Sequence, residues 1–420
     1  MRASNLTAVL PDYSKEKLLI DADIKGPGKA VGPYFDETPL KDSLGATLQE
    51  LQLDGDVNAR LHLDIPLNGE LVTAKGEVTL RNNSLFIKPL DSTLKNLSGK
   101  FSFINGDLQS EPLTASWFNQ PLNVDFSTKE GAKAYQVAGE ILNGNWQPAK
   151  TGVLPAAVNE ALSGSVAWDG KVGIELPYHA GATYNVELNG DLKNVSSHLP
   201  SPLAKPAGEP LPVNVKVDGN LNSFELTGQA GADNHFNSRW LLGQKLTLDR
   251  AIWAADSKTL PPLPEQSGVE LNMPPMNGAE WLALFQKGAA ESVGGAASFP
   301  QHITLRTPML SLGNQQWNNL SIVSQPTANG TLVEAQGREI NATLAMRNNA
   351  PWLANIKYLY YNPSVPKTHG DSTNSSPFPT TERISFRGWP DAQNTMRRVL
   401  VLGGKNSGAL TVISPFLAIH

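Results

Sequence analysis

The sequence predicts an all-β protein built mainly from antiparallel strands. Three observations support this fold class: apolar residues that alternate with polar ones, turn-type dipeptides between the alternating segments, and glycine and proline spread along the chain. In VNVKVDGNLNSFELTG (213–228), for example, Val213, Val215 and Val217 would share one face of a strand. The chain has 36 glycines and 31 prolines in 420 residues, which favours many short strands over long helices.

The alternation recurs along the chain and indicates strands with one polar face. Its apolar positions are, in order, Ile20, Ala22 and Ile24; Leu61, Leu63 and Ile65; Val78 and Leu80; Phe101 and Phe103; Leu122, Val124 and Phe126; Val186 and Leu188; Leu246 and Leu248; Ile303 and Leu305; Leu320 and Ile322; and Ile340, Ala342, Leu344 and Met346. We therefore expect sheet structure from the first segment to the last.

Asn-Gly or Asp-Gly dipeptides recur between apolar residues and predict two-residue hairpin turns, because both residue types tolerate positive φ angles. They lie at 54–55, 68–69, 105–106, 143–144, 169–170, 189–190, 218–219 and 329–330. Eight such dipeptides indicate antiparallel hairpins in series. Their irregular spacing argues against a repeat of fixed period.

Three segments have the apolar spacing of short helices. They are TPLKDSLGATLQEL (38–51), LPAAVNEALSG (154–164) and NGAEWLALFQKG (277–288). Thr38 is a candidate N-cap of the first, and Asn277 with Glu280 forms a variant of the capping box in the third. We interpret them as helices that close part of the core; a mobile lid and a membrane-touching helix are the alternatives.

Three polar, proline-rich segments predict long surface loops or linkers. They are 196–212, 256–268 and 362–382. These segments contain no binding motif.

Charge and composition exclude several classes of protein. The 34 Lys and Arg against 39 Asp and Glu give a net charge of −5, so we expect no nucleic-acid partner. The absence of cysteine excludes disulfides, thiolate metal sites and a cysteine nucleophile. The sequence shows neither a membrane span nor an export signal.

Motifs for catalysis and cofactor binding are missing as well. The seven histidines, at 62, 179, 198, 235, 302, 369 and 420, form no metal-binding spacing. GPGKAVG from Gly26 and VLGGKNSG from Val401 depart from the phosphate-binding patterns, and no nucleophile elbow is present. The paired carboxylates Asp54 and Asp56 flank a turn glycine, and solvated turn chemistry explains them without a catalytic role. We therefore predict no enzyme, no cofactor and no metal site.

Three stretches carry a resemblance to a known family. GKFSFINGDLQSEPLTASWFNQPLNVDFSTKEGAKAYQV, LPSPLAKPAGEPLPVNVKVDGNLNSFELTG and ERISFRGWPDAQ resemble a large member of the AsmA-like family of Gram-negative envelope proteins. The likeness is nearly continuous from about Ala3 to Gln393 and falls in the central region of that member. The family has no catalytic signature.

The resemblance implies both a fold and a function. The implied fold is an elongated, highly twisted antiparallel sheet that curls into an apolar groove, a repeating β-groove, with a few short helices. Members are anchored in the inner membrane and extend through the periplasm. They are implicated in phospholipid movement toward the outer membrane and so in its permeability barrier. The implied partners are phospholipid acyl chains, and membranes at both ends of the full-length protein.

The resemblance also suggests a division of the chain. Residues 1–393 correspond to a segment of the central β-groove region, and residues 394–420 do not match the family. We interpret 394–420 as an aberrant tail, translated from a shifted reading frame, and the chain as a fragment without the anchor of the full-length protein.

If the groove exists, apolar strand positions line it collectively. The candidates are Leu61, Leu63, Phe101, Phe103, Val124, Phe126, Val213, Val215, Val217, Phe224 and Leu226. From patterning alone, a set of β-sandwiches whose inward residues pack on one another is the alternative fold. The alternative function is a structural or polysaccharide-binding envelope protein, which predicts aromatic platforms on the polar face. Trp117, Trp146, Trp168 and Trp317 do not recur at a fixed strand position.

Overall fold

The computed structural model describes residues 2–11, 17–30, 50–68, 71–88, 91–152, 154–178, 180–291, 297–298, 300–362 and 399–402. These residues fall into two compact units. Unit 1 comprises Met1–Leu199, Ala204–Ala232 and Arg239–Leu246, and unit 2 comprises Pro200–Leu203, Asp233–Ser238 and the described residues from Thr247 onward.

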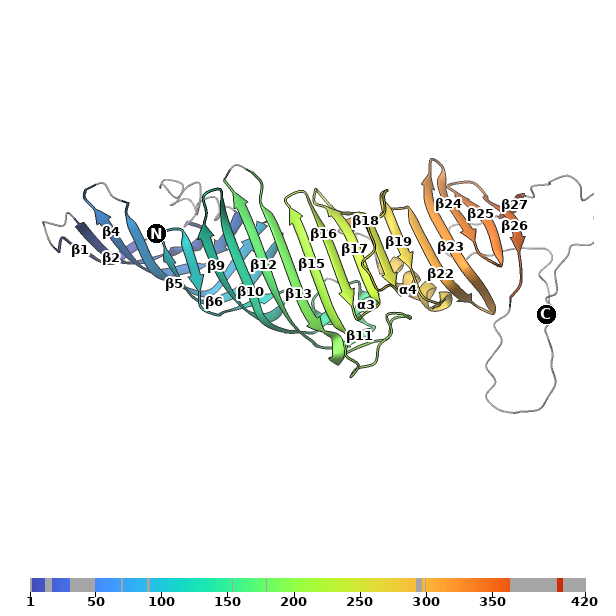
Figure 1. The fold of residues 1–420 in the computed structure, drawn as a ribbon, viewed down its shortest axis with the longest axis horizontal. Coiled ribbons are helices and arrows are strands. Elements are labelled where there is room, and N and C mark those ends of the chain that lie inside the picture. The colour runs from blue at the N-terminus through green and yellow to red at the C-terminus, as the bar shows by residue number, and fades with distance from the viewer. Residues whose placement is uncertain are drawn as a thin grey trace, which may run out of the picture. The chain divides into compact units, whose positions relative to one another are not determined.

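Unit 1 is built almost entirely of strands (Figure 1). The strands are β1 (Arg2–Val9), β2 (Lys17–Pro27), β3 (Leu51–Asp54), β4 (Asp56–Pro66), β5 (Thr73–Ile87), β6 (Ser92–Ile104), β7 (Asp107–Ser110), β8 (Leu113–Trp117), β9 (Gln120–Glu130), β10 (Ala134–Trp146), β12 (Val166–Pro177), β13 (Thr183–Asp191), β15 (Pro212–Asn220) and β16 (Ser223–Ala230). The strands β11 (Leu162–Gly164) and β14 (Val195–Ser197) form a separate pair. β17 (Asn234–Leu241) has residues in both units.

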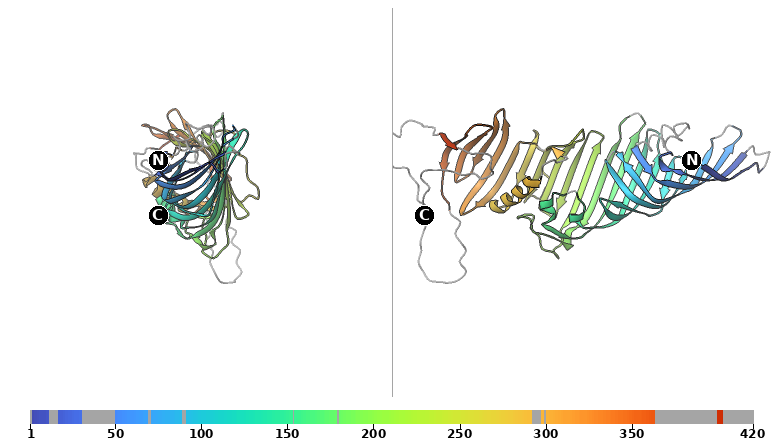
Figure 2. Two further views of the ribbon diagram at one scale, coloured as in Figure 1. Left: turned by 90° about the vertical axis from the view of Figure 1, so that its left-hand side faces the viewer. Right: turned by 180° about the vertical axis from the view of Figure 1, so that it is seen from behind.

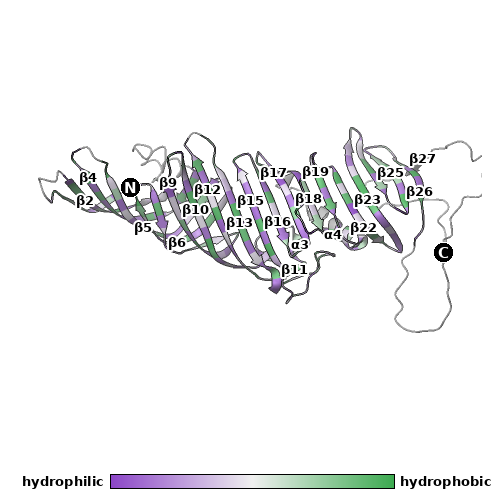
Figure 3. Ribbon diagram, viewed as in Figure 1, coloured by the Kyte–Doolittle hydropathy of each residue, from purple (hydrophilic) through white to green (hydrophobic). Residues whose placement is uncertain are grey.

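The strands of unit 1 pair with neighbours close in sequence and are antiparallel. The pairs are β1–β2, β2–β4, β3–β5, β4–β5, β5–β6, β6–β7, β6–β8, β7–β9, β8–β9, β9–β10, β10–β12, β12–β13, β13–β15 and β15–β16. The alternation of hydropathy along these strands is visible in Figure 3. The all-β, mostly antiparallel class predicted from the sequence is confirmed.

A bend in β5 makes the sheet of unit 1 curl. Asn82 has a φ of 54°, and the register against β6 shifts on either side of Asn83. The buried Asn83 side chain donates to the carbonyl oxygens of Asp54 (3.0 Å) and Asp56 (3.1 Å). Beyond this bulge, β5 pairs with β3, and Leu51 and Ile87 pack onto the cluster around Tyr135 of β10. Figure 2 shows the curl of these strands, blue to green, from one end.

Two of the eight predicted turns are hairpin turns. Asn105–Gly106 connects β6 and β7, where Ile104 pairs with Asp107. Near 329–330, Ala328 and Asn329 form the turn, because Thr327 pairs with Gly330. The dipeptide at 68–69 falls partly outside the described residues.

The other turn predictions are wrong. Asp54–Gly55 joins β3 to β4, but these strands pair with β5 and not with each other. The dipeptides at 143–144, 169–170, 189–190 and 218–219 lie inside β10, β12, β13 and β15.

Two of the glycines inside strands have a packing reason, which is the close approach of an aromatic ring. Gly144 and Gly190 are the two cross-strand partners of Trp168, and a Cβ atom at Gly144 would overlap its indole ring. Gly219 lies in the same way opposite Tyr184. Glycine at 144 and 219 makes room for an aromatic ring on the neighbouring strand.

The helical predictions are confirmed in part. α4 (Gly278–Glu291) begins after Asn277, which accepts from the Ala279 amide (3.1 Å) and donates to Glu280 (2.8 Å). It continues past the expected end at Gly288. In the 154–164 segment, α3 (Ala156–Asn159) is a single turn, and β11 replaces the rest of the expected helix because it pairs with β14. The 38–51 prediction lies almost wholly outside the described residues.

Single turns and irregular segments account for much of the rest of unit 1. The 3₁₀ turns are η2 (Gly28–Ala30), η5 (Pro148–Lys150) and η6 (Leu192–Asn194). The expected loop at 196–212 contains the last two residues of β14 and, within Pro200–Leu203 of unit 2, the cis peptide bond Ser201–Pro202. The Lys205 ammonium group donates to the carbonyl oxygens of Val195 and Pro206, each at 3.0 Å.

Unit 2 contains a mixed sheet, which differs from the expected wholly antiparallel one. Its strands are β18 (Leu246–Ala255, of which Leu246 belongs to unit 1), β19 (Gly268–Asn272), β20 (Met276–Asn277), β21 (Ala297–Ser298), β22 (Ile303–Leu312), β23 (Gln315–Thr327), β24 (Gly330–Gln336), β25 (Ile340–Arg347), β26 (Trp352–Leu359) and β27 (Val399–Leu402). The strands from β22 to β27 pair antiparallel in chain order.

The parallel pairs of unit 2 are β18–β19, β19–β22 and β20–β22. Parallel neighbours need a crossover connection, and α4 lies in the connection between β20 and β22. The predicted loop at 256–268 connects β18 to β19. The predicted loop at 362–382 lies outside the described residues except for Asn362. The segment 394–420 lies outside them except for the four residues of β27.

Candidate functional site

The strands of unit 1 place apolar residues in register on one face. Antiparallel partners that lie directly opposite share a face of the sheet, so rows of partners run across the strands. One row consists of Gly139, Val172, Val186, Val217 and Leu226, on β10, β12, β13, β15 and β16. The next row consists of Val137, Ile174, Tyr184, Gly219 and Phe224. These rows form a continuous apolar face across five strands.

The eleven predicted lining residues all lie in strands of unit 1, and each is half-buried. Leu61 and Leu63 are on β4, Phe101 and Phe103 on β6, and Val124 and Phe126 on β9. The five others are on β15 and β16.

Some of these residues pack on buried clusters of the curl. Phe101, Val124 and Phe126 surround a cluster that includes Leu113, and the rings of Phe101 and Phe126 lie 5.6 Å apart. Val217 and Phe224 pack against the cluster around Tyr135. On β4, Leu61 and Leu63 lie opposite Ala22 and Ile20 of β2. The eleven residues therefore differ in how much protein surrounds them.

The opposite face of the same strands is polar. On β15, Asn214 donates to Asn189 (2.7 Å) and to Glu187 (3.2 Å), and the Lys216 ammonium lies 3.6 Å from the Glu187 carboxylate. Lys216 and Asp218 are exposed. The two faces of β15 thus have opposite character, as the alternation predicts.

Tyr135 anchors the buried end of the apolar face and is fully buried. Its hydroxyl group donates to the carbonyl oxygen of Gly106 and lies 2.6 Å from the Thr128 hydroxyl oxygen. Burial raises the pKa of Tyr135 to about 12, against the opposing effect of the Thr128 hydrogen bond. The phenol therefore stays neutral and serves as a structural donor.

Sequence reasoning missed an aromatic cluster formed by Trp117, Phe118, Trp146 and Trp168. Ring centroids lie 5.8 Å apart for Trp117 and Trp146, and 4.5 Å apart for Trp146 and Trp168. The Trp117 indole donates to Ser92, and that of Trp146 to the Pro121 carbonyl. These residues are far apart in sequence, and strand pairing brings them together. The glycine opposite Trp168 is the one local signal of this packing.

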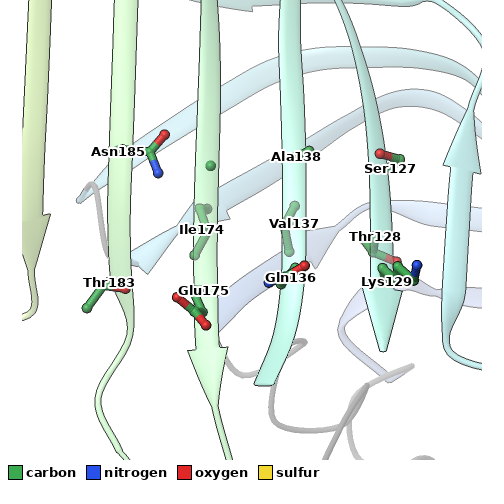
Figure 4. A pocket seen from close by; sticks show the side chains of 11 residues that line it. Ser127, Thr128, Lys129, Gln136, Val137, Ala138, Ile174, Glu175, Thr183 and Asn185 are labelled. Carbon is green, nitrogen blue, oxygen red and sulfur yellow. The ribbon is translucent and has the colours of Figure 1, made fainter. Parts of the chain in front are cut away.

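A hollow lies over β9, β10, β12 and β13 (Figure 4), and apart from Val137 and Ile174 its lining is mainly polar. Its lining residues are Ser127, Thr128, Lys129, Gln136, Val137, Ala138, Gly173, Ile174, Glu175, Thr183 and Asn185. This lining contains no aromatic side chain. The aromatic platform expected for polysaccharide binding is therefore not found in this hollow.

No metal site is formed by the part of the chain that the structure describes: it contains no group of three or more His, Asp or Glu residues placed to hold a metal ion. His62 bonds instead to Asp21 across two strands (2.8 Å). None of the described helices is both long and apolar enough to cross a membrane.

Comparison with known proteins identifies the family. Residues 1–414 match the family model described as YhdP protein. The chain is 96% identical over 393 residues to the protein named intermembrane phospholipid transporter YhdP of Escherichia coli (strain K12). That alignment covers 94% of the chain but 31% of the relative. No solved structure matches the chain.

Proposed function

Because the chain belongs to the YhdP family, we propose that it is a segment of a non-enzymatic lipid-transport bridge. Its apolar strand face shields phospholipid acyl chains between the inner and outer membranes and so supports the outer-membrane barrier. The protein that contains it is periplasmic and anchored to the inner membrane. The curated relative carries the name of an intermembrane phospholipid transporter, and the chain spans about a third of its length.

Moving an acyl chain between membranes requires an apolar surface that keeps it out of water. Exposing an acyl chain of about sixteen carbons to water costs roughly 0.8 kcal/mol per methylene, on the order of 13 kcal/mol. A continuous aliphatic surface offsets most of this cost along the path. It needs no nucleophile, metal or cofactor.

The observation that carries the proposal is the two-sided character of β15. Val213, Val215 and Val217 are half-buried in register with the apolar residues of β13, whereas Lys216 and Asp218 are exposed. A half-buried aliphatic face on a long sheet is the surface that an acyl chain would cover. Leu61 and Leu63 of β4 have the same half-buried state, and we include all eleven predicted residues in the proposed lining.

The test places a photo-crosslinking residue singly at positions 213 to 217 of the intact, envelope-localised protein. We expect phospholipid attached at 213, 215 and 217, and none at 214 or 216. Absence of lipid at all five positions, in protein that is folded and exported, would mean that these valines pack on protein. The alternative role, that of a structural or polysaccharide-binding envelope protein, would then be favoured.

We also propose that residues 1–393 belong to the central β-groove region and that 394–420 arise from a shifted reading frame. Sequencing the encoding DNA tests this second point. A relative's sequence in another frame would support it, and the absence of such a sequence would refute it.

A further inference from the structure

Helix α4 lies on the apolar face of unit 2 (Figure 2, right). A row of cross-strand partners on that face consists of Trp253, Leu271, Leu305, Ile322 and Ala335, from β18 to β24. The first three pack around a buried cluster to which α4 contributes. The helix thus covers the part of the row on β18, β19 and β22.

Trp281 is the main side chain by which α4 occupies this face. It is 8% exposed and belongs to the same buried cluster as Met273 and Met276. The ring centroids of Trp281 and Trp253 lie 6.2 Å apart, and the angle between the ring planes is 62°. Leu284, one turn further along α4, packs against the same cluster.

Trp281 makes apolar contacts with the buried cluster of this face. Its indole nitrogen also donates a hydrogen bond to the Ser201 carbonyl oxygen (3.0 Å). The neighbouring Leu282 is 50% exposed and so points away from the sheet. Apolar contacts of this kind are non-directional, and an acyl chain can make the same contacts with Trp253, Leu271 and Leu305.

The same face continues onto β24 and β25, beyond the strands that α4 contacts in the described part of the chain. On β24 and β25, Val333, Ala335, Ala342 and Leu344 are half-buried. Leu344 lies three strands from β22, which is about 14 Å at the usual strand spacing. Unit 2 therefore offers a position under α4 and a position outside it on one face.

From this arrangement we infer that Trp281 controls the access of acyl chains to the β18–β19–β22 part of unit 2. When Trp281 is docked, α4 takes the place of lipid, and lipid reaches Trp253, Leu271 and Leu305 only when the helix moves away. This inference rests on the proposed function, since it presumes that apolar strand faces carry acyl chains.

The experiment uses a diazirine-bearing aliphatic residue, close to leucine in size, in the intact, envelope-localised protein. It is placed singly at 305, under the helix, at 344, outside it, and at 215 in unit 1. Phospholipid attached after illumination is measured by mass spectrometry. The wild-type background is compared with Trp281→Ala, Trp281→Phe and Leu282→Ala.

We expect lipid at 215 and 344 in the wild-type background and severalfold less at 305. Trp281→Ala should raise labelling at 305 severalfold, toward the level at 344. Trp281→Phe keeps an aromatic ring but loses the bond to Ser201, so its rise should be smaller. Leu282→Ala removes an outward side chain and should leave labelling at 305 low.

Other outcomes overturn the inference. Equal labelling at 305 and 344 in the wild-type background would show that α4 does not exclude lipid. Unchanged labelling at 305 in both Trp281 variants would show that Trp281 does not control access. This conclusion holds whether or not the variants change the sensitivity of α4 to proteolysis. Lipid at 215 but not at 344 refutes this inference alone, whereas lipid at neither position refutes the proposed function as well.

Discussion

Two regions of unit 1 share the same alternation of residues and differ in burial. Near the bend, Leu113 of β8 is 1% exposed and Tyr135 of β10 is 0% exposed. On β15, Val213 and Val215 remain half-buried. Around Tyr135, residues of other strands, such as Leu51 of β3 and Ile87 of β5, pack against the apolar face. Alternation thus decides which side chains share a face, and the path of the other strands decides which of them are enclosed.

The comparison teaches that one apolar face can serve two purposes. Where strands return over it, the face forms a core that stabilises the curl. Where its side chains stay half-buried, we propose that lipid covers the face. Substitutions should therefore affect stability in the first region and transport in the second.

The largest expected effect is on transport. Val215→Asp places a carboxylate on the proposed lipid path and should abolish most complementation of a transport-deficient strain, because a charge in an apolar environment is costly. Lys216→Asp, one residue away on the polar face, is the control; it removes an exposed ion pair with Glu187 that contributes about 1 kcal/mol or less. Equal losses at equal protein levels would contradict the division of β15 into two faces.

The next effect is on stability in the enclosed region. Leu113→Ala should lower the free energy of unfolding by about 2–5 kcal/mol, because it leaves a cavity in a packed core. Val215→Ala removes less buried surface and should cost about 1 kcal/mol. Denaturant unfolding of the two variants measures the difference. Similar values would mean that β15 is as enclosed as β8.

A third effect depends on pH. The pKa of Tyr135 is about 12 in the folded protein against 10.0 for the ordinary side chain, so the unfolded state loses its proton first. The contribution of Tyr135 to the free energy of unfolding is therefore present in full below pH 10 and is lost as the pH rises to 12. It amounts to about 2–3 kcal/mol, at roughly 1.4 kcal/mol for each pKa unit. Between pH 9 and 12 the free energy of unfolding should fall by about this much more in the wild type than in Tyr135→Phe, which keeps only the smaller loss from Tyr178 and Tyr184.

The smallest of these effects concerns a cross-strand glycine. Gly144→Ala introduces a Cβ atom against the Trp168 ring and should destabilise by about 1–3 kcal/mol through overpacking. Gly181→Ala is the matched control, since its Cβ atom would be 3.6 Å from Leu221, an ordinary contact. Thermal unfolding compares the two. A neutral Gly144→Ala variant would show that Trp168 can shift freely.

The sequence by itself determined the fold class and the strand faces. Alternation at Leu61 and Leu63, or at Val213 to Val217, requires only that neighbouring side chains point to opposite faces, which is a local property of extended backbone. The family also followed from the sequence, because near-identity over 393 residues is a property of the residues alone. The membership of the proposed lining remains a prediction.

Tertiary structure decided what surrounds each face. The dipeptides at 143–144 and 218–219 have the composition of turns, yet they lie inside paired strands, where Gly144 and Gly219 leave room for Trp168 and Tyr184 on neighbouring strands. The parallel pairs of unit 2 and the position of α4 over Leu305 likewise depend on contacts between residues distant in sequence. Such contacts produce no periodic pattern in the sequence. The burial of a face depends on which distant strand packs against it, and the residues of the face itself do not specify that strand.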